Sequence, residues 1–166
     1  MMTGAKIILR TELDAARDGL AGLAGASWMM SLPRRRAAYS GHPAGRGRPG
    51  FVADGGAGLI AVTFGIMTAP AADHVVLPVG WEPVEPDDEF TVQLKGSLIL
   101  APATTQGHCA LTLSGVCQVP RAALTLGGRD QVRLELVEAA REFITGVARD
   151  ITLGAGSGSL GQFWAW

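Results

Sequence analysis

Polar and apolar residues alternate along two segments of this chain, residues 88–101 and residues 107–119. The apolar positions are Phe90, Val92, Leu94, Leu98 and Leu100 in the first segment, and Cys109, Leu111, Leu113, Cys117 and Val119 in the second. Because successive side chains of a strand point to opposite faces of a sheet, this alternation predicts two half-buried antiparallel strands. We expect a turn at residues 103–106 to connect them.

Residues 129–152 change to a repeat of about 3.6 residues, which is the period of an α-helix. The apolar stripe consists of Val132, Leu136, Val137, Ala140, Phe143, Ile144, Val147, Ala148 and Ile151. Charged residues such as Glu142 and Arg149 lie largely off this stripe. The segment therefore predicts one long amphipathic helix with a single apolar face.

The N-terminal part predicts a strand over residues 5–13 and then a helix over residues 15–30, with apolar residues near helical spacing as far as Met29. Asp14 is a residue type that commonly caps helices, so we expect it to be the N-cap. Three glycines each weaken this helix by up to about 1 kcal/mol relative to alanine, so two short helical pieces are an alternative. These glycines are Gly19, Gly22 and Gly25.

Residues 33–50 are rich in glycine, proline and arginine, which predicts a loop, with a short turn of helix as an alternative. Further strands are expected over residues 51–54, 58–68 and 74–84, with turns at residues 54–56 and 70–73. The chain thus runs from a strand through helices and several antiparallel strands to a long C-terminal helix. This order predicts an α+β fold in which a curved antiparallel sheet wraps around the C-terminal helix.

Within residues 74–152, the segments HVVLPVGWEPVEPDDEFTVQLKGSLILAPA, CALTLSGVCQVP and LVEAAREFITGVARDI resemble actinobacterial members of the START-like superfamily. In those members a strand that ends in Trp-Glu is followed by two alternating strands and a closing helix. The superfamily includes polyketide cyclases, aromatase/cyclases and lipid-transfer domains. The resemblance implies a helix-grip fold with an apolar cavity between the sheet and the helix. Residues 14–56 depart from the usual pattern of two helices after the first strand, because they are rich in glycine and arginine.

The length of 166 residues is that of one ordinary domain, and we expect residues 1–153 to form it. Residues 154–166 begin with glycine and serine, which predicts a mobile tail. The tail ends in the aromatic sequence Phe163-Trp164-Ala165-Trp166. This end is expected to contact either the domain or a second copy of the chain, so a homodimer is one arrangement left open.

The formal charge is −1 and the isoelectric point is near 6.3, which argues against a general electrostatic interaction with nucleic acid. Charged residues make up only 17% and mean hydropathy is +0.24, so the chain is apolar for a soluble domain. The uncharged residues 55–72 just reach membrane-spanning length, but their glycines and Pro70 favour a buried strand with flanking turns over a transmembrane segment. The apolar run at residues 7–9 is too short for a signal peptide, so a cytoplasmic protein is expected.

The residue pattern indicates no cofactor and no metal. Two G-x-G-x-x-G matches, at residues 45–50 and 156–161, do not stand between a strand and a helix, so we interpret them as loops. His42, His74 and His108 occur in three separate segments without zinc-binding spacing. A surface role is the expected one for these histidines, and an acid–base site that uses one of them is the alternative.

Other residues that could take part in catalysis or binding have simpler interpretations. Cys109 and Cys117 on one strand would be about 26 Å apart at ~3.3 Å per residue, far beyond disulfide reach, so both are expected to fill the core as free thiols. Glu82 should face solvent because strand alternation puts Trp81 on the apolar face. The run of residues 34–36, all arginine, is expected to be solvated, with an anionic head group as the alternative partner.

These patterns favour binding or carriage of a small hydrophobic or amphipathic molecule, lipids included, in an apolar cavity between the sheet and the C-terminal helix. The expected ligand-binding residues are Phe90, Val92, Leu94, Leu98, Leu111, Leu113, Phe143, Ile144 and Val147. No catalytic residue is assigned. A cofactor-independent cyclase, dehydratase or hydrolase is one alternative, and polar residues inside the cavity would distinguish it. An interaction protein with a fully packed core is the other, and cavity volume would distinguish that.

Overall fold

The computed structural model of the chain describes residues 1–38, 50–84, 93–119 and 129–153. Its strands are β1 (Met2–Leu9), β2 (Ser27–Ala38), β3 (Gly50–Phe64), β4 (Thr68–Ala71), β5 (His74–Pro83), β6 (Gln93–Pro102) and β7 (Cys109–Gln118), and its helices are α1 (Leu13–Ala21) and α3 (Arg129–Leu153). The strands form one antiparallel sheet in the order β1-β7-β6-β5-β3-β2, while β4 pairs with β5.

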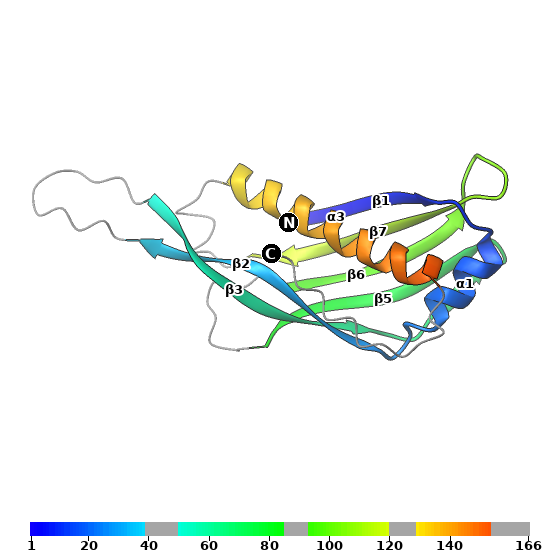
Figure 1. The fold of residues 1–166 in the computed structure, drawn as a ribbon, viewed down its shortest axis with the longest axis horizontal. Coiled ribbons are helices and arrows are strands. Elements are labelled where there is room, and N and C mark those ends of the chain that lie inside the picture. Colours follow the sequence, from blue (N-terminus) through cyan, green and yellow to red (C-terminus); the bar gives the residue numbers. More distant parts are fainter. Residues whose placement is uncertain (39–49, 85–92, 120–128, 154–166) are drawn as a thin grey trace, which may run out of the picture.

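The sheet is curled into a half-barrel, and α3 lies along its concave side, which we call the inner face (Figure 1). The short helix α1 lies at one end of the sheet, between β1 and β2 in the chain. This arrangement confirms the predicted α+β class with a curved antiparallel sheet around a C-terminal helix, and it is consistent with a helix-grip fold.

Strands β6 and β7 confirm the alternation that the sequence shows. Every second residue is buried on the inner face, and Leu98 lies opposite Leu113 as Leu100 lies opposite Leu111. The connection is longer than the predicted turn: it covers residues 103–108 and includes Gly107, whose φ of +73° is in the left-handed region that glycine tolerates. Residues 88–92 of the predicted strand lie outside the described residues.

The predicted helix over residues 15–30 is wrong in its second half. Helix α1 ends at Ala21, and the chain enters β2 at Ser27. Gly25 has a φ of +76°, so this glycine adopts the left-handed conformation that commonly follows the end of a helix. The apolar residues that continue the helical spacing beyond this point belong to a strand instead, with Trp28 on the inner face and Met29 on the outer face.

The start of the chain also differs in its boundaries. The first strand covers Met2–Leu9 and not residues 5–13. Glu12, with φ −69° and ψ 156°, is the N-cap of α1, so the prediction of Asp14 as the N-cap is wrong. Asp14 lies in the first turn, where its carboxylate interacts favourably with the positive end of the helix dipole.

Residues 33–50 are only partly the loop that composition predicts, because Pro33–Ala38 continue β2 and Gly50 begins β3. The two strands predicted over 51–54 and 58–68 are one strand, β3. The predicted turn at residues 54–56 is a bulge: Ala53 pairs with Arg35 and Ala57 with Pro33, so three residues of β3 stand opposite one residue of β2. Residues 39–49 lie outside the described residues.

Strand β4 extends the line of β3 along β5 after a break at residues 65–67. Phe64 pairs with Val79, the Gly65 amide donates to the Pro78 carbonyl at 2.9 Å, and Thr68 pairs with Val76. A turn at residues 72–73 then reverses the chain into β5, as predicted within residues 70–73.

Helix α3 has the predicted bounds to within one residue, and its predicted apolar stripe faces the core. The buried members are Val132, Leu136, Ala140, Phe143, Ile144, Val147, Ala148 and Ile151. They join the inner-face residues of the sheet in one continuous hydrophobic core, together with Ala16 and Leu20 of α1. Burial of these apolar side chains is the main source of the favourable free energy that holds α3 on the sheet.

Two glycines lie side by side on the inner face, where β6 and β7 approach closely. Gly96 and Gly115 are direct cross-strand partners, in a row that continues to Thr3 on one side and Val79 on the other. A Cβ atom on Gly96 would stand 2.5 Å from the Ser114 carbonyl oxygen. The sheet therefore needs bare backbone at these two positions, as expected where a curved sheet bends.

None of the helices in the described part of the chain is both long and apolar enough to cross a membrane. The predicted tail over residues 154–166 lies outside the described residues.

Candidate functional site

Aromatic side chains from three strands and α3 meet on the inner face of the sheet. We call Trp28, Phe64, Trp81 and Phe143 the aromatic cluster. Phe143 has its ring centroid 5.3 Å from that of Trp81 in an edge-to-face contact, and 6.3 Å from those of Trp28 and Phe64. Trp28 and Phe64 contact each other edge to face at 5.0 Å. These separations are in the range in which aromatic pairs add stability beyond their buried area.

Strand pairing explains why these rings come together. Trp28 on β2 pairs with Val62 on β3, and Val62 pairs with Trp81 on β5, so the two indoles belong to one row across the sheet. Phe64 is two residues along β3 and on the same face. Phe143 is at the middle of α3 and extends to this row from the helix. The aromatic cluster therefore spans the space between α3 and strands β2, β3 and β5.

The helix does not cover all strands equally. Its backbone packs most closely against β1, and its other close neighbours are α1 and β7. On the side of β2 and β3, the core ends in apolar side chains that are only partly buried, namely Trp28, Met30 and Met67. We call these three residues the rim. The rim shares Trp28 with the aromatic cluster, and other partly buried apolar side chains border the core at β1 and α1, among them Ala5, Ile7 and Leu13.

The residues expected to bind ligand lie on the buried faces assigned to them. Those described are Leu94, Leu98, Leu111, Leu113, Phe143, Ile144 and Val147, and all are buried in the core. Phe90 and Val92 lie outside the described residues. The structure brings Phe143 together with Trp28, Phe64 and Trp81, which sequence reasoning did not assign to the site. Strand alternation predicts that Trp81 lies on the apolar face, whereas the helical spacing predicts a helix at Trp28.

Two buried polar atoms on the inner face have no hydrogen-bond partner among the described residues. One is the indole nitrogen Nε1 of Trp81, whose side chain is fully buried. The other is the hydroxyl oxygen Oγ1 of Thr3, which stands opposite Gly115 on β1. A buried donor without a partner costs about 1–3 kcal/mol, and most buried polar groups of native proteins avoid this cost. Both atoms lie among the apolar side chains of the core.

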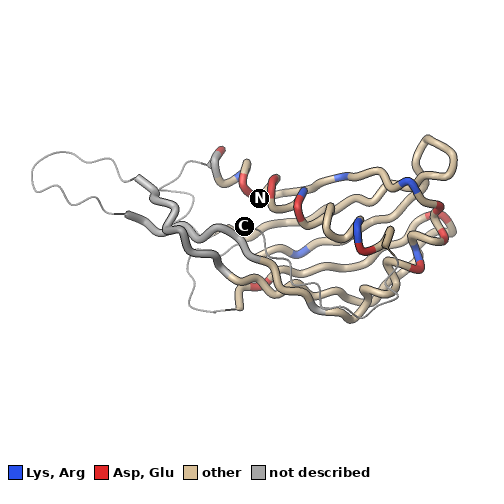
Figure 2. Tube along the Cα trace, viewed as in Figure 1, with Lys and Arg blue, Asp and Glu red and all other residues tan. Residues whose placement is uncertain are grey.

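Charged side chains of the described residues stay outside this interior. Figure 2 shows few charged positions along the strands and more along α3 and around α1. No Asp, Glu, His, Lys or Arg belongs to the side chains described as buried, although the Nε atom of Arg17 is enclosed. Glu82 is exposed on the outer face, as predicted, while Trp81 beside it is buried. No group of three His, Cys, Asp or Glu in the described ranges could hold a metal ion.

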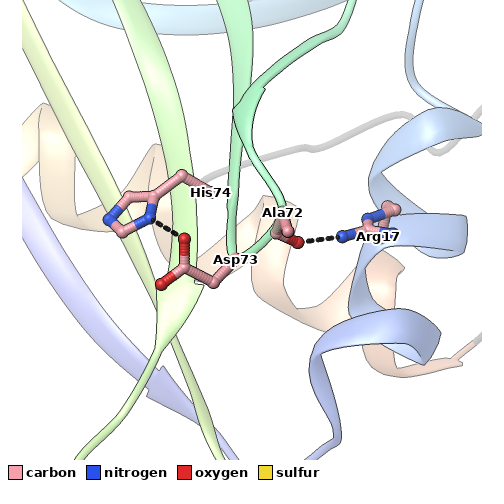
Figure 3. Close-up of polar contacts among 4 residues, drawn as sticks. All are labelled: Arg17, Ala72, Asp73 and His74. Carbon is pink, nitrogen blue, oxygen red and sulfur yellow. Dashed lines mark hydrogen bonds and ion pairs between the residues drawn. The ribbon is translucent and has the colours of Figure 1, made fainter.

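One histidine–carboxylate pair exists at the turn before β5 (Figure 3). The Nδ1 atom of His74 and the Oδ1 atom of Asp73 are 2.8 Å apart, and the hydrogen bond to His74 lowers the pKa of the Asp73 carboxyl. Arg17 of α1 donates to the Ala72 carbonyl at 2.9 Å and so ties the helix to this turn. His74 is exposed and has the opposite strand parity to the buried Val75 and Leu77. The pair therefore belongs to the surface, away from the aromatic cluster.

The two cysteines are free and buried, as predicted, and each faces the core from one end of β7. Burial raises the pKa of Cys109, and it raises the pKa of Cys117 from 9.0 to about 11. The nucleophilic thiolate is therefore disfavoured at both positions near neutral pH.

We expect the Cys117 thiol to contribute a pH-dependent stability. The folded state holds the proton up to about pH 11, whereas the unfolded chain loses it near 9.0. The contribution is therefore fully present below about pH 9 and is lost as pH rises to about 11. Urea unfolding at several pH values should show a steeper alkaline loss of stability in the wild type than in Cys117→Ala. Equal slopes would contradict the expectation.

Comparison with known proteins gives no family. No protein-family model matches the chain, and no curated protein matches it. Among solved structures, it is similar to a hypothetical protein from Helicobacter pylori, with 7% identity and a TM-score of 0.48 over 92% of this chain and 86% of that one. It is also similar to a protein from Arthrobacter aurescens, with 13% identity and a TM-score of 0.42 over 98% of this chain and 92% of that one. At these scores the likenesses carry no argument, so the fold rests on the chain's own strand order and helix.

Proposed function

We propose that this protein binds a small apolar or amphipathic molecule between the inner face of the sheet and α3. The observation that carries the proposal is the aromatic cluster beside the partly buried rim. Large aromatic rings offer apolar contact area at low cost in conformational entropy, and such surfaces commonly form small-molecule sites. The rim residues Met30 and Met67 have flexible, polarizable side chains that adapt to differently shaped ligands.

The chemistry of the interior also supports binding. Thr3 is the one polar residue among those described as buried, and Trp81 contributes its indole nitrogen. An apolar ligand would extend this core, whereas a charged group there would lose its hydration without gaining a partner charge from the described residues. The START-like resemblance of residues 74–152 supports the same proposal, because that superfamily carries apolar ligands between sheet and helix. The catalytic alternative has no observation in its favour among the described residues.

A neutral fluorescent probe tests the proposal. We expect N-phenyl-1-naphthylamine to bind saturably, with enhanced and blue-shifted emission, because its rings would contact the aromatic cluster. Met30→Glu should weaken this binding about tenfold or more, since a carboxylate at the rim must be desolvated when the probe enters. Met29→Glu is the matched control, because Met29 is the adjacent residue on the outer face and is 49% exposed.

The outcomes separate ligand binding in the site from an interaction protein with a fully packed core. Probe binding that only Met30→Glu weakens supports the proposal, as does native mass spectrometry that shows an apolar molecule bound to protein purified from its own host. Equal effects of the two variants would place the probe on the surface and contradict the site. Absence of any binding, with a ligand-free mass, would favour an interaction protein with a fully packed core.

A further inference from the structure

The indole N–H of Trp81 is a buried donor on the inner face of the sheet, where the proposed function places the ligand. The side chain is fully buried, and its ring contacts Phe143 edge to face at 5.3 Å. Nε1 has no acceptor among the described residues. An indole N–H can only donate a hydrogen bond, so the group that completes this site must be an acceptor.

The surroundings of Trp81 restrict what this acceptor is. Its neighbours across the strands are Val62 and Leu94, which are both buried and apolar. No cationic residue is among those described as buried. A carboxylate or phosphate at this depth would lose its hydration for a single neutral hydrogen bond, which is a strongly unfavourable exchange. An uncharged oxygen loses much less, because its desolvation cost is close to what one hydrogen bond returns.

The aromatic cluster restricts the rest of the molecule. Phe143 meets Trp81 and Trp28 edge to face, Trp28 meets Phe64 edge to face, and the Phe64 and Phe143 rings lie 20° from parallel. A planar ring system can stack on such rings or meet their edges, whereas a saturated chain gains only area.

Resting on the proposed function, we propose that the ligand class is an uncharged, planar aromatic compound whose carbonyl oxygen accepts a hydrogen bond from the Trp81 indole N–H. The N–H···O=C bond fixes the orientation of the ligand, and the aromatic cluster supplies the contact area. Trp81 thus acts as the specificity-determining residue, because a hydrocarbon of the same shape would leave its donor without a partner.

Fluorene and 9-fluorenone test this inference, since they share one ring skeleton and differ by a CH₂ and a C=O group. Both are used to displace N-phenyl-1-naphthylamine from the intact protein. We expect 9-fluorenone to bind about tenfold more tightly than fluorene, which corresponds to about 1.4 kcal/mol. Fluorene-9-carboxylate should bind least. Trp81→Phe should abolish the preference for the ketone, whereas Thr3→Val, which removes the other unpartnered polar atom on the inner face, should retain it.

A spectroscopic measurement keeps the inference testable should Trp81→Phe fail to fold. The ¹⁵N–¹H spectrum of the wild type contains the tryptophan indole signals, and Phe variants at Trp28, Trp164 and Trp166 identify the Trp81 signal by elimination. The Trp81 indole proton should shift downfield with 9-fluorenone and not with fluorene. Equal affinity for the two compounds, with no such shift, would overturn the inference and leave the proposed function intact. Failure of the probe and both compounds to bind would overturn the proposed function itself.

Discussion

Replacement of Phe143 by alanine is expected to lower the free energy of unfolding by about 3–5 kcal/mol, the range observed for buried phenylalanines. The ring lies at the centre of the aromatic cluster and contacts Trp28, Phe64 and Trp81. Its loss removes apolar contacts and leaves a cavity between α3 and the sheet. Because these rings come from different elements, they cannot collapse into the space without moving whole strands. Urea unfolding followed by circular dichroism measures the effect.

The matched control is Glu142→Ala, one residue earlier on α3. Glu142 is exposed and off the apolar stripe, so its replacement should change stability by less than about 0.5 kcal/mol. A small effect for both variants would mean that α3 does not pack on the sheet through Phe143. If Phe143→Ala changed the free energy of unfolding only slightly yet abolished binding of N-phenyl-1-naphthylamine, the ring would line the ligand site and contribute little to the packed core.

Gly96→Ala is expected to cost about 3 kcal/mol, at the upper end of the range for overpacked sites. The added Cβ would stand 2.5 Å from the Ser114 carbonyl oxygen and 2.8 Å from the Cα of Gly115. Both atoms belong to the backbone of β7, so relief requires β6 and β7 to separate where the sheet bends. The loss of curvature would also disturb the inner face. Thermal and urea unfolding should both report the decrease.

Gly80→Ala provides the control for a glycine in a neighbouring strand of the same sheet. Gly80 faces outward between the buried Val79 and Trp81, and its added Cβ would meet the Thr63 side-chain oxygen at 3.0 Å. A threonine side chain can rotate, and alanine is better than glycine within a strand, so the cost should stay below about 1 kcal/mol. A Gly80→Ala variant as unstable as Gly96→Ala would show that the effect is general to strand glycines and not due to the β6–β7 approach.

The sequence predicts the C-terminal half well because local pattern and burial agree there. In β6 and β7 a period of two places Leu98 and Leu113 on one face, and tertiary pairing buries that face. In α3 a period of 3.6 produces one stripe around Phe143, and the sheet covers that stripe. In both cases one face is apolar and the other polar, so only one orientation buries the apolar side chains.

The N-terminal half is predicted less well because its apolar residues fit two periods. Trp28 and Met29 continue the spacing of α1, yet they belong to β2, where one faces inward and the other outward. Gly25 was the available signal, since a glycine after a short helix commonly ends it. Pairing with β3 then decides the outcome. It gives the backbone of β2 the hydrogen-bond partners that a strand needs, whereas a helix would form its hydrogen bonds within itself.

Only part of the candidate site can be predicted from the sequence, because its contacts also depend on strand pairing. Phe143 was assigned to it from the helical stripe, and the inward orientation of Trp81 follows from strand alternation. The contact of both with Trp28 and Phe64 depends on a row that crosses β2, β3 and β5. No spacing along the chain encodes that row, since register between strands is set by pairing and by bulges such as the one at residues 54–56.

The residue pattern was sufficient to predict the α+β class, the two alternating strands, the C-terminal helix and the apolar face of each. These features follow from side-chain periodicity, which is a property of neighbouring residues. Three other features could be seen only in the folded molecule: residues 27–38 form a strand, Gly96 and Gly115 lie side by side, and the Trp81 indole N–H is buried without an acceptor among the described residues. These features depend on which strands pair and in what register, because contacts between residues far apart in the chain are fixed by packing and not by local pattern.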